Sequence, residues 1–222
     1  MGRVTDERIV GTPHGEARIV AYRARRPVAT LALGHGAGAG IESGDLAALA
    51  GRLPKQDMNV FLIEQPWRRA GRKLAPAPKV LDEAWIAIIG QLRVRTPLVI
   101  GGRSAGARVA CRTASSLGAS GVLAMSFPLH APGKPEKSRV DELHQAGLPT
   151  LVVQGERDPF GTPEEFPPLT EMAVVPDADH SFKVPKRAES APSTLASASS
   201  ARHMPPVASL AWSNDAIFRD ER

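Results

Sequence analysis

The chain has 222 residues, 42% of them hydrophobic and 23% charged, which is long enough to bury one substantial core and typical of an ordinary globular domain. Its single cysteine, Cys111, excludes a disulfide framework and a metal site made of paired cysteines, and it favours the cytoplasm as the compartment. The net charge of +5 raises the question of nucleic acid or acidic ligands, but Lys and Arg are scattered along the sequence.

Targeting segments and nucleic-acid motifs are not evident either. Residues 3–8 carry several charges where a secretory signal would need an apolar stretch. No apolar run approaches the roughly 20 residues of a membrane-spanning helix, so we expect no association with a membrane. The dense basic cluster at residues 67–73 has no nucleic-acid motif around it, so we expect a solvated loop there in preference to an anion-binding site.

The first half of the chain alternates short apolar runs with stretches of helical period, which predicts a mostly parallel sheet with crossover helices. The start is an exception, because two runs flank the turn-rich residues 12–15 and predict an antiparallel hairpin. The strands expected in this half are 8–11, 17–22, 29–33, 58–64 and 98–100, the last ending at Gly101, and the helices are 45–53 and 79–94.

The second half continues this alternation and then changes character. We expect helices at 105–117 and 139–146 and strands at 122–125, 150–153 and 172–175. This order predicts a doubly wound sheet, in which ligands bind outside the carboxyl ends of the strands. Residues 186–222 are rich in Ala, Ser and Pro, so we expect a poorly ordered tail after a domain at residues 1–185, with at most a short helix at 210–218.

A candidate nucleophile lies between a predicted strand and a predicted helix. Gly102-Arg103-Ser104-Ala105-Gly106 matches the G-x-S-x-G pattern, in which a sharp turn exposes the serine hydroxyl above the sheet. Residues two positions to either side must be small to avoid collisions with the adjoining strand and helix, and Gly102 and Gly106 satisfy this need. The pattern predicts Ser104 as the nucleophile.

An acid and a histidine follow in the chain order of serine hydrolases with this elbow. Asp158 follows the strand at 150–153 and His180 follows the strand at 172–175, so both should lie at the same edge of the sheet as Ser104. Glu156 is the credible substitute for Asp158, and His130 is a weaker rival of His180. The remaining histidines and the aspartates at 141, 177 and 179 lie in less suitable places.

A glycine-rich segment after the strand at 29–33 is the candidate oxyanion loop. Acyl transfer needs two preorganised donors for the developing negative charge, and the natural ones are the backbone N–H groups of Ala105 and of Ala37, with Gly36 as the alternative to Ala37. Gly36 and Gly38 would give the loop its geometry. The segment lacks the Gly-Lys-Ser/Thr ending and the G-x-G-x-x-G spacing of phosphate loops, so a nucleotide site is not expected.

In combination, these motifs resemble the α/β-hydrolase superfamily over residues 28–183. The chain is similar to the dienelactone-hydrolase-like group, and within it to the branch that contains testis-expressed protein 30 and the hydrolase-like subunit of the NSL histone acetyltransferase complex. The resemblance rests on residues 35–38, 101–108, 127–129, 132–135, 154–161 and 179–181. It implies an α/β-hydrolase fold, a doubly wound, mostly parallel sheet with an N-terminal antiparallel hairpin and minimal or no cap.

The motifs together predict a serine hydrolase that cleaves a small carboxylic ester or thioester without a cofactor or metal. Dienelactone hydrolases use a cysteine nucleophile, so Ser104 gives no ground for lactone specificity. Only residues 126–149 are available for a lid, which favours short or exposed acyl groups in a small-molecule substrate. Because some relatives are parts of assemblies, a catalytically silent interaction module is the alternative function, and a protein partner is left open.

Overall fold

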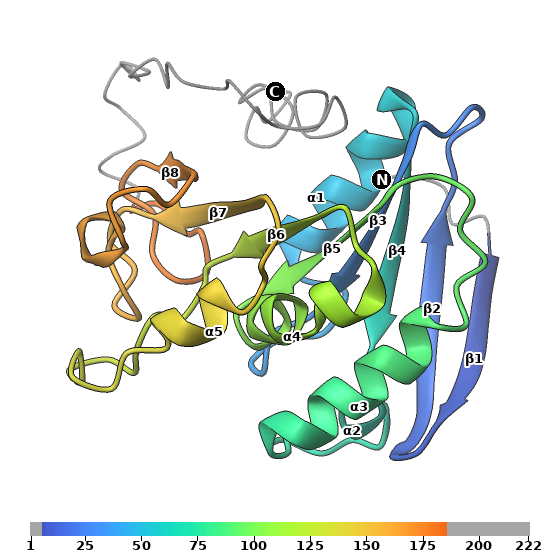
Figure 1. The fold of residues 1–222 in the computed structure, drawn as a ribbon, viewed down its shortest axis with the longest axis horizontal. Coiled ribbons are helices and arrows are strands. Elements are labelled where there is room, and N and C mark those ends of the chain that lie inside the picture. The colour runs from blue at the N-terminus through green and yellow to red at the C-terminus, as the bar shows by residue number, and fades with distance from the viewer. Residues whose placement is uncertain (1–5, 186–222) are drawn as a thin grey trace.

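Eight strands form one twisted sheet in the computed structural model of the chain, which describes residues 6–185 (Figure 1). The strand order is β1-β2-β4-β3-β5-β6-β7-β8. The strands are β1 (Asp6–Thr12), β2 (Gly15–Tyr22), β3 (Ala29–Gly34), β4 (Met58–Glu64), β5 (Leu98–Arg103), β6 (Gly121–Met125), β7 (Thr150–Gly155) and β8 (Met172–Val175). The α-helices are α1 (Gly44–Arg52), α2 (Pro66–Arg69), α3 (Pro78–Ile89), α4 (Ala105–Thr113) and α5 (Val140–His144). The prediction for residues 186–222 lies outside the described residues.

The sheet has the predicted fold class. β1 and β2 form an antiparallel hairpin, β2 is also antiparallel to β4, and β4, β3, β5, β6, β7 and β8 are parallel to their neighbours. The strand order reverses at β3, which pairs with β4 on one side and β5 on the other. Such a reversal brings the loops at the carboxyl ends of the strands apart and leaves space for a ligand. The predictions of a doubly wound sheet and an N-terminal hairpin are confirmed.

Helices cover both faces of the sheet, with α1 on one face and α3, α4 and α5 on the other (Figure 1). Every residue of β3 is buried, as expected for a central strand that is packed on both faces. Trp85 of α3 fills the core on one face, whereas Leu46 and Leu49 of α1 pack on the other. The central strand that leads into the glycine-rich loop is therefore packed on both faces.

Two predicted boundaries in the middle of the chain were wrong. The helix predicted at 79–94 ends at Ile89, because Gly90 disfavours a further helical turn and the chain closes in tight bonds from Gln91 N to Ile88 O and from Leu92 N to Ile89 O. The strand predicted at 98–100 continues through both glycines to Arg103. Both glycines are paired in the sheet, and glycine is needed at these strand positions because neighbouring backbone leaves no room for a Cβ atom.

Other boundaries differ from the predictions by a few residues. The helix predicted at 105–117 ends at Thr113, and a 3-10 turn at Ser115–Leu117 completes the segment. The helix predicted at 45–53 ends at Arg52, because Pro54 lies in a 3-10 turn at Leu53–Gln56. The helix predicted at 139–146 is shorter, at Val140–His144.

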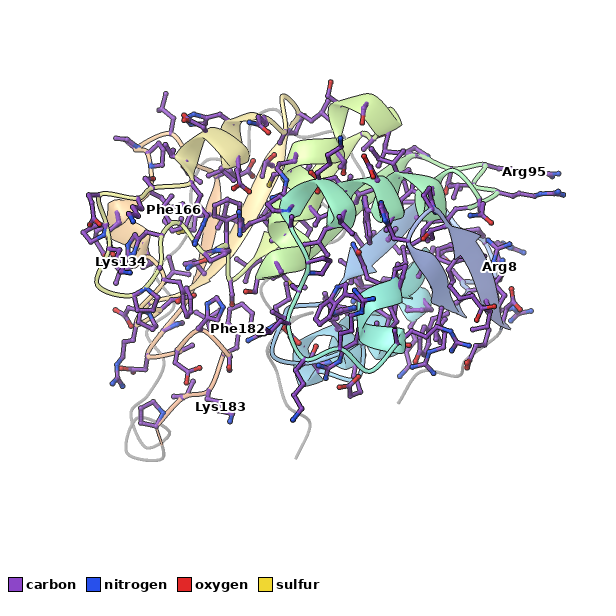
Figure 2. The ribbon with its side chains drawn as sticks, turned by 90° about the horizontal axis from the view of Figure 1, so that it is seen from below. Arg8, Arg95, Lys134, Phe166, Phe182 and Lys183 are labelled. Carbon is purple, nitrogen blue, oxygen red and sulfur yellow. The ribbon has the colours of Figure 1, made fainter. Side chains whose placement is uncertain are left out.

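The basic cluster at residues 67–73 is not simply a solvated loop. It begins in the short helix α2, where Trp67 is buried against the core. Arg69 lies 3.4 Å from Glu16, and Arg68 lies 4.0 Å from Glu42. Other basic residues are spread over the surface, with Arg8 and Arg95 at one end of the molecule and Lys134 at the other (Figure 2). The labelled basic residues therefore do not form a single positively charged patch.

The connection between β6 and β7 contains only the short helix α5, so the described residues provide no large cap over the carboxyl edge of the sheet. This agrees with the prediction of a minimal cap. Among residues 6–185, no helix combines the length and the apolar character needed to cross a membrane.

Candidate active site

Ser104 lies at the turn between β5 and α4 in a rarely populated backbone conformation, with φ of 52° and ψ of −110°. A non-glycine residue with positive φ is strained and is retained only where the surroundings enforce it. Here the Ser104 N–H donates to Met125 O at 2.9 Å, and Ser104 O accepts from Arg108 N–H of the following helix at 3.2 Å. The turn thus fixes the direction of the hydroxyl.

The glycines on either side of Ser104 are required by close backbone contacts. A Cβ atom on Gly102 would lie 2.5 Å from Gly34 O, and one on Gly106 would lie 2.6 Å from the same oxygen. These separations are far below van der Waals contact. The small residues expected from the elbow pattern therefore allow β5 and α4 to approach β3.

Ser104, His180 and Asp158 form a continuous hydrogen-bonded chain. The hydroxyl of Ser104 lies 3.0 Å from His180 Nε2, while His180 Nδ1 lies 2.8 Å from Asp158 Oδ2 and 3.0 Å from Oδ1. Because a carboxylate only accepts, Nδ1 carries the ring proton and Nε2 is left to accept from the hydroxyl. His180 is 16% exposed and Asp158 is fully buried. The three side chains come from loops after β5, β7 and β8.

The carboxylate of Asp158 is held by residues that the sequence reasoning missed. Gln154 at the end of β7 donates its amide to Asp158 Oδ2 at 2.9 Å, and the Phe160 N–H donates to Oδ1 at 2.8 Å. The Phe160 ring also packs on the His180 ring, with 4.2 Å between centroids. A polar residue near the end of a mostly apolar strand, four residues before the candidate acid, is the signal that could have identified Gln154.

Neither alternative residue takes part in this chain of hydrogen bonds. Glu156 points elsewhere and accepts the Asp177 N–H at 2.7 Å. His130 contacts Glu165 at 2.8 Å through Nε2 and the carbonyl of Ala131 at 2.9 Å through Nδ1. The structure therefore brings Asp158 and His180 to Ser104 and places both substitutes in other contacts.

The side chain of His35 stabilises the candidate oxyanion loop by hydrogen bonds. Its Nδ1–H donates to Gly36 O at 2.8 Å, and its Nε2 accepts the Gln65 N–H at 3.1 Å. These roles require a neutral ring, and burial lowers the pKa of His35. This role is not visible in the sequence, because the partner Gln65 is 30 residues away along the chain. The ring thus ties the loop after β3 to the loop after β4.

The loop lies beside the nucleophile. A Cβ atom on Gly36 would meet Ser104 Cβ at 3.4 Å, whereas one on Gly38 would meet nothing within 4 Å. Ala105 is the first residue of α4, so its N–H is one of the donors that a helix leaves without an internal partner. Ala37 lines the same cavity as Ser104. These positions suit the donor roles predicted for Ala37 and Ala105.

A cavity of about 990 Å³ adjoins the hydroxyl of Ser104. Its wall combines apolar side chains with Arg52, Arg103 and Lys183. Lys183 follows Phe182 in the loop after β8 and lies at the edge of the molecule (Figure 2). The cavity can hold a small molecule close to the hydroxyl of Ser104. Within residues 6–185, no group of three or more His, Cys, Asp or Glu side chains could hold a metal ion.

A comparison with protein families finds one match. The model described as "Alpha/beta hydrolase domain" matches residues 27–204, which includes the whole parallel part of the sheet. No curated protein matches the sequence.

Solved structures with the same fold include a serine hydrolase without a lid from Xanthomonas campestris, which has a TM-score of 0.62 at 16% identity and covers 82% of this chain and 89% of its own. The dienelactone hydrolase from Anabaena variabilis has a TM-score of 0.62 at 17% identity, with 81% and 90% covered. A Pyrococcus furiosus esterase has a TM-score of 0.62 at 18% identity, with 79% and 82% covered. At these identities the likeness establishes the fold.

Proposed function

The chain belongs to the alpha/beta hydrolase family, and on this premise we propose that it is a serine hydrolase that cleaves a small carboxylic ester or thioester through an acyl-enzyme on Ser104. The observation that carries the proposal is the hydrogen-bonded chain from Ser104 Oγ through His180 to Asp158. The sequence resemblance extends the proposal to the dienelactone-hydrolase-like group and its branch with testis-expressed protein 30. The single cysteine supports a cytoplasmic location.

The reaction follows from the positions of the donors and acceptors. His180 Nε2 takes the hydroxyl proton of Ser104 as Oγ attacks the acyl carbon, and Asp158 stabilises the imidazolium. The N–H groups of Ala105 and Ala37 stabilise the oxyanion of the tetrahedral intermediate. His180 then gives the proton to the leaving alcohol or thiol, which leaves an acyl group on Ser104. Water, activated by the same ring, releases the carboxylic acid and restores the hydroxyl.

The size of the substrate is inferred from the surroundings of Ser104. The connection between β6 and β7 carries only α5, and the cavity of about 990 Å³ is within the range of small-molecule sites. The far end of a long acyl chain would extend beyond the apolar wall and stay in water, so it would contribute no hydrophobic free energy to binding. Esters with short acyl chains should therefore be preferred over long-chain lipids.

The proposal is tested by labelling the full chain with a fluorophosphonate probe and measuring the intact mass. One adduct on Ser104, absent from Ser104→Ala, is the expected result. A panel of p-nitrophenyl esters of increasing acyl length should show the highest kcat/KM for short chains. If the folded protein binds a partner but takes no label and hydrolyses no ester or thioester, the alternative of a catalytically silent interaction module replaces the proposal.

A further inference from the structure

We propose that Arg103, the residue before the nucleophile, is a positioning residue that holds the His180 loop at the correct distance from Ser104. This inference rests on the proposed serine-hydrolase function. Arg103 ends β5 but its side chain crosses to the loop after β8, where Nη2 donates to the backbone carbonyl of His180 at 2.7 Å. The same nitrogen lies 3.3 Å from Ser181 Oγ. One side chain thus joins the backbone of the proposed nucleophile's strand to the backbone of the proposed base.

The guanidinium is held in place by a second contact. Its Nε lies 3.0 Å from Asp45 Oδ2, and the two side chains are 9% and 13% exposed. Asp45 belongs to the first turn of α1, so this contact comes from a different element than the His180 carbonyl. Nη1 lies beside the candidate oxyanion loop, 3.2 Å from where a Cβ of Gly36 would be. Arg103 therefore touches three segments that surround Ser104.

The His180 loop needs such an attachment because its strand is at the edge of the sheet. β8 has four residues and pairs with β7 alone, whereas Ser104 follows β5, three strands away. Some bonds of the loop are internal: Asp179 Oδ1 accepts from the N–H groups of Ser181 and Lys183, at 2.7 and 3.0 Å. Others join it to the loop after β7, where the Arg157 N–H donates to Ala178 O at 2.9 Å. These contacts attach the loop to itself and to its neighbour after β7, whereas the Arg103 side chain attaches the backbone of the loop to β5.

Arginine suits this role better than lysine. The guanidinium is a planar, extended cation with five donors, so it can form an ion pair with Asp45 on its Nε side while Nη2 donates to the His180 carbonyl. A lysine ammonium is a single point and would reach one of these partners. A displacement of about 1 Å between a base and its nucleophile can reduce a rate by about 100-fold. Loss of the bond between Arg103 and the His180 carbonyl could therefore reduce the rate strongly even if His180 moved only slightly relative to Ser104.

The test compares Arg103→Met and Arg103→Lys with Arg112→Met in the full chain. Arg112 is the matched control because it is an equally buried arginine, 11% exposed and bonded to Asp82 and Glu142, but belongs to α4 on the far side of the elbow. The rate of labelling by a fluorophosphonate probe and the kcat and KM for a short p-nitrophenyl ester are measured. All rates are corrected for the folded fraction, which is taken from thermal unfolding.

We expect Arg103→Met to reduce kcat and the labelling rate by about 10- to 100-fold with little change in KM, and Arg103→Lys to restore part of the loss. Arg112→Met should lose thermal stability and keep its labelling rate. Equal labelling rates for wild type, Arg103→Met and Arg112→Met after correction would overturn the inference. Equal losses in the two methionine variants would overturn it too, because the effect would then be one of general destabilisation.

A second measurement does not depend on activity. Proton NMR reports the downfield signal of the His180 Nδ1–H that donates to Asp158, assigned by its loss in Asp158→Asn. We expect this signal to broaden in Arg103→Met and to remain in Arg112→Met. If the wild type shows the signal but takes no label, the proposed function fails. The NMR comparison of Arg103→Met with Arg112→Met then tests the role of Arg103 by itself. An unchanged signal in Arg103→Met refutes the positioning role.

Discussion

Gln154 donates its side-chain amide to Asp158 Oδ2 at 2.9 Å, and neither residue has any exposed surface. The same amide nitrogen lies 2.8 Å from Gly161 O and 3.4 Å from Phe127 O, so its two hydrogens are shared among three acceptors in the loops after β6 and β7. Burying a carboxylate is costly unless donors replace water. Gln154 therefore serves both the folding of this loop and the orientation of the proposed catalytic acid.

Replacing Gln154 by Leu should lower the free energy of unfolding by about 2 kcal/mol or more, because buried acceptors would lose their donor. It should also lower kcat by about 10-fold or more, since Asp158 would be free to turn away from His180. Urea unfolding and ester hydrolysis measure the two effects. Gln91→Leu is the control: its amide also bonds two carbonyls, of Gly11 and Ala87, but on the surface, and it should change neither quantity appreciably.

The close approach of β5 to β3 gives a second prediction. Gly102→Ala should destabilise the protein by about 3 kcal/mol or more, because the new Cβ would lie 2.5 Å from Gly34 O and 2.8 Å from Gly106 C, neither of which can move easily. Gly11→Ala, where nothing lies within 4 Å of the new Cβ, serves as the comparison. Thermal unfolding of the two variants decides. Similar melting temperatures for both would show that the elbow is not as tightly packed as described.

Cys111 should be inert in the folded protein. Its side chain is buried within α4, and desolvation raises the pKa of the thiol to about 12, so almost no thiolate exists near neutral pH. We expect iodoacetamide at about pH 8 to leave the native protein unmodified and to add one group after denaturation in urea. Mass spectrometry counts the groups. Rapid modification of the native protein would contradict the described burial.

Sequence reasoning located the main parts of the candidate site because each depends on local chemistry. The G-x-S-x-G elbow needs small neighbours at fixed positions, and the loops with Asp158 and His180 follow apolar strands whose direction is set by the parallel sheet. The fold class was predictable for the same reason, since alternating apolar runs and helical periods are visible along the chain. These features need no knowledge of distant contacts.

Residues that act by reaching across the fold were not predictable in this way. Arg103 occupies a position that the elbow pattern leaves open, and its partners lie on α1 and after β8. His35 stands beside a glycine run in the sequence, and only the fold brings its ring between that run and the loop after β4. The continuation of β5 through Gly101 was missed because glycine usually interrupts strands, whereas here it admits the backbone of Leu123. Such roles are decided by packing between distant segments.

His130 contacts both ends of the segment 160–165, which follows Asp158. Its backbone N–H donates to Phe160 O at 3.0 Å, and its ring lies between the Ala131 carbonyl and the Glu165 carboxylate. The bond to Ala131 O raises the pKa of His130, and Glu165 adds to this effect, while burial and the nearby Arg139 oppose it. The bond from the Thr162 backbone N–H lowers the pKa of Glu165, and His130 lowers it further.

The pair should therefore make stability depend on pH in a defined direction. The contribution of His130 is fully present below its unfolded pKa, near 6.5, and is lost as the pH rises through the higher folded pKa; that of Glu165 is present above about 4.5 and is lost as the pH falls. His130→Gln should thus cost more free energy of unfolding at about pH 5.5 than at about pH 8.5. Urea unfolding at both values measures this difference. A cost for His130→Gln that is equal at both pH values, or larger at the higher one, would refute the charged pair.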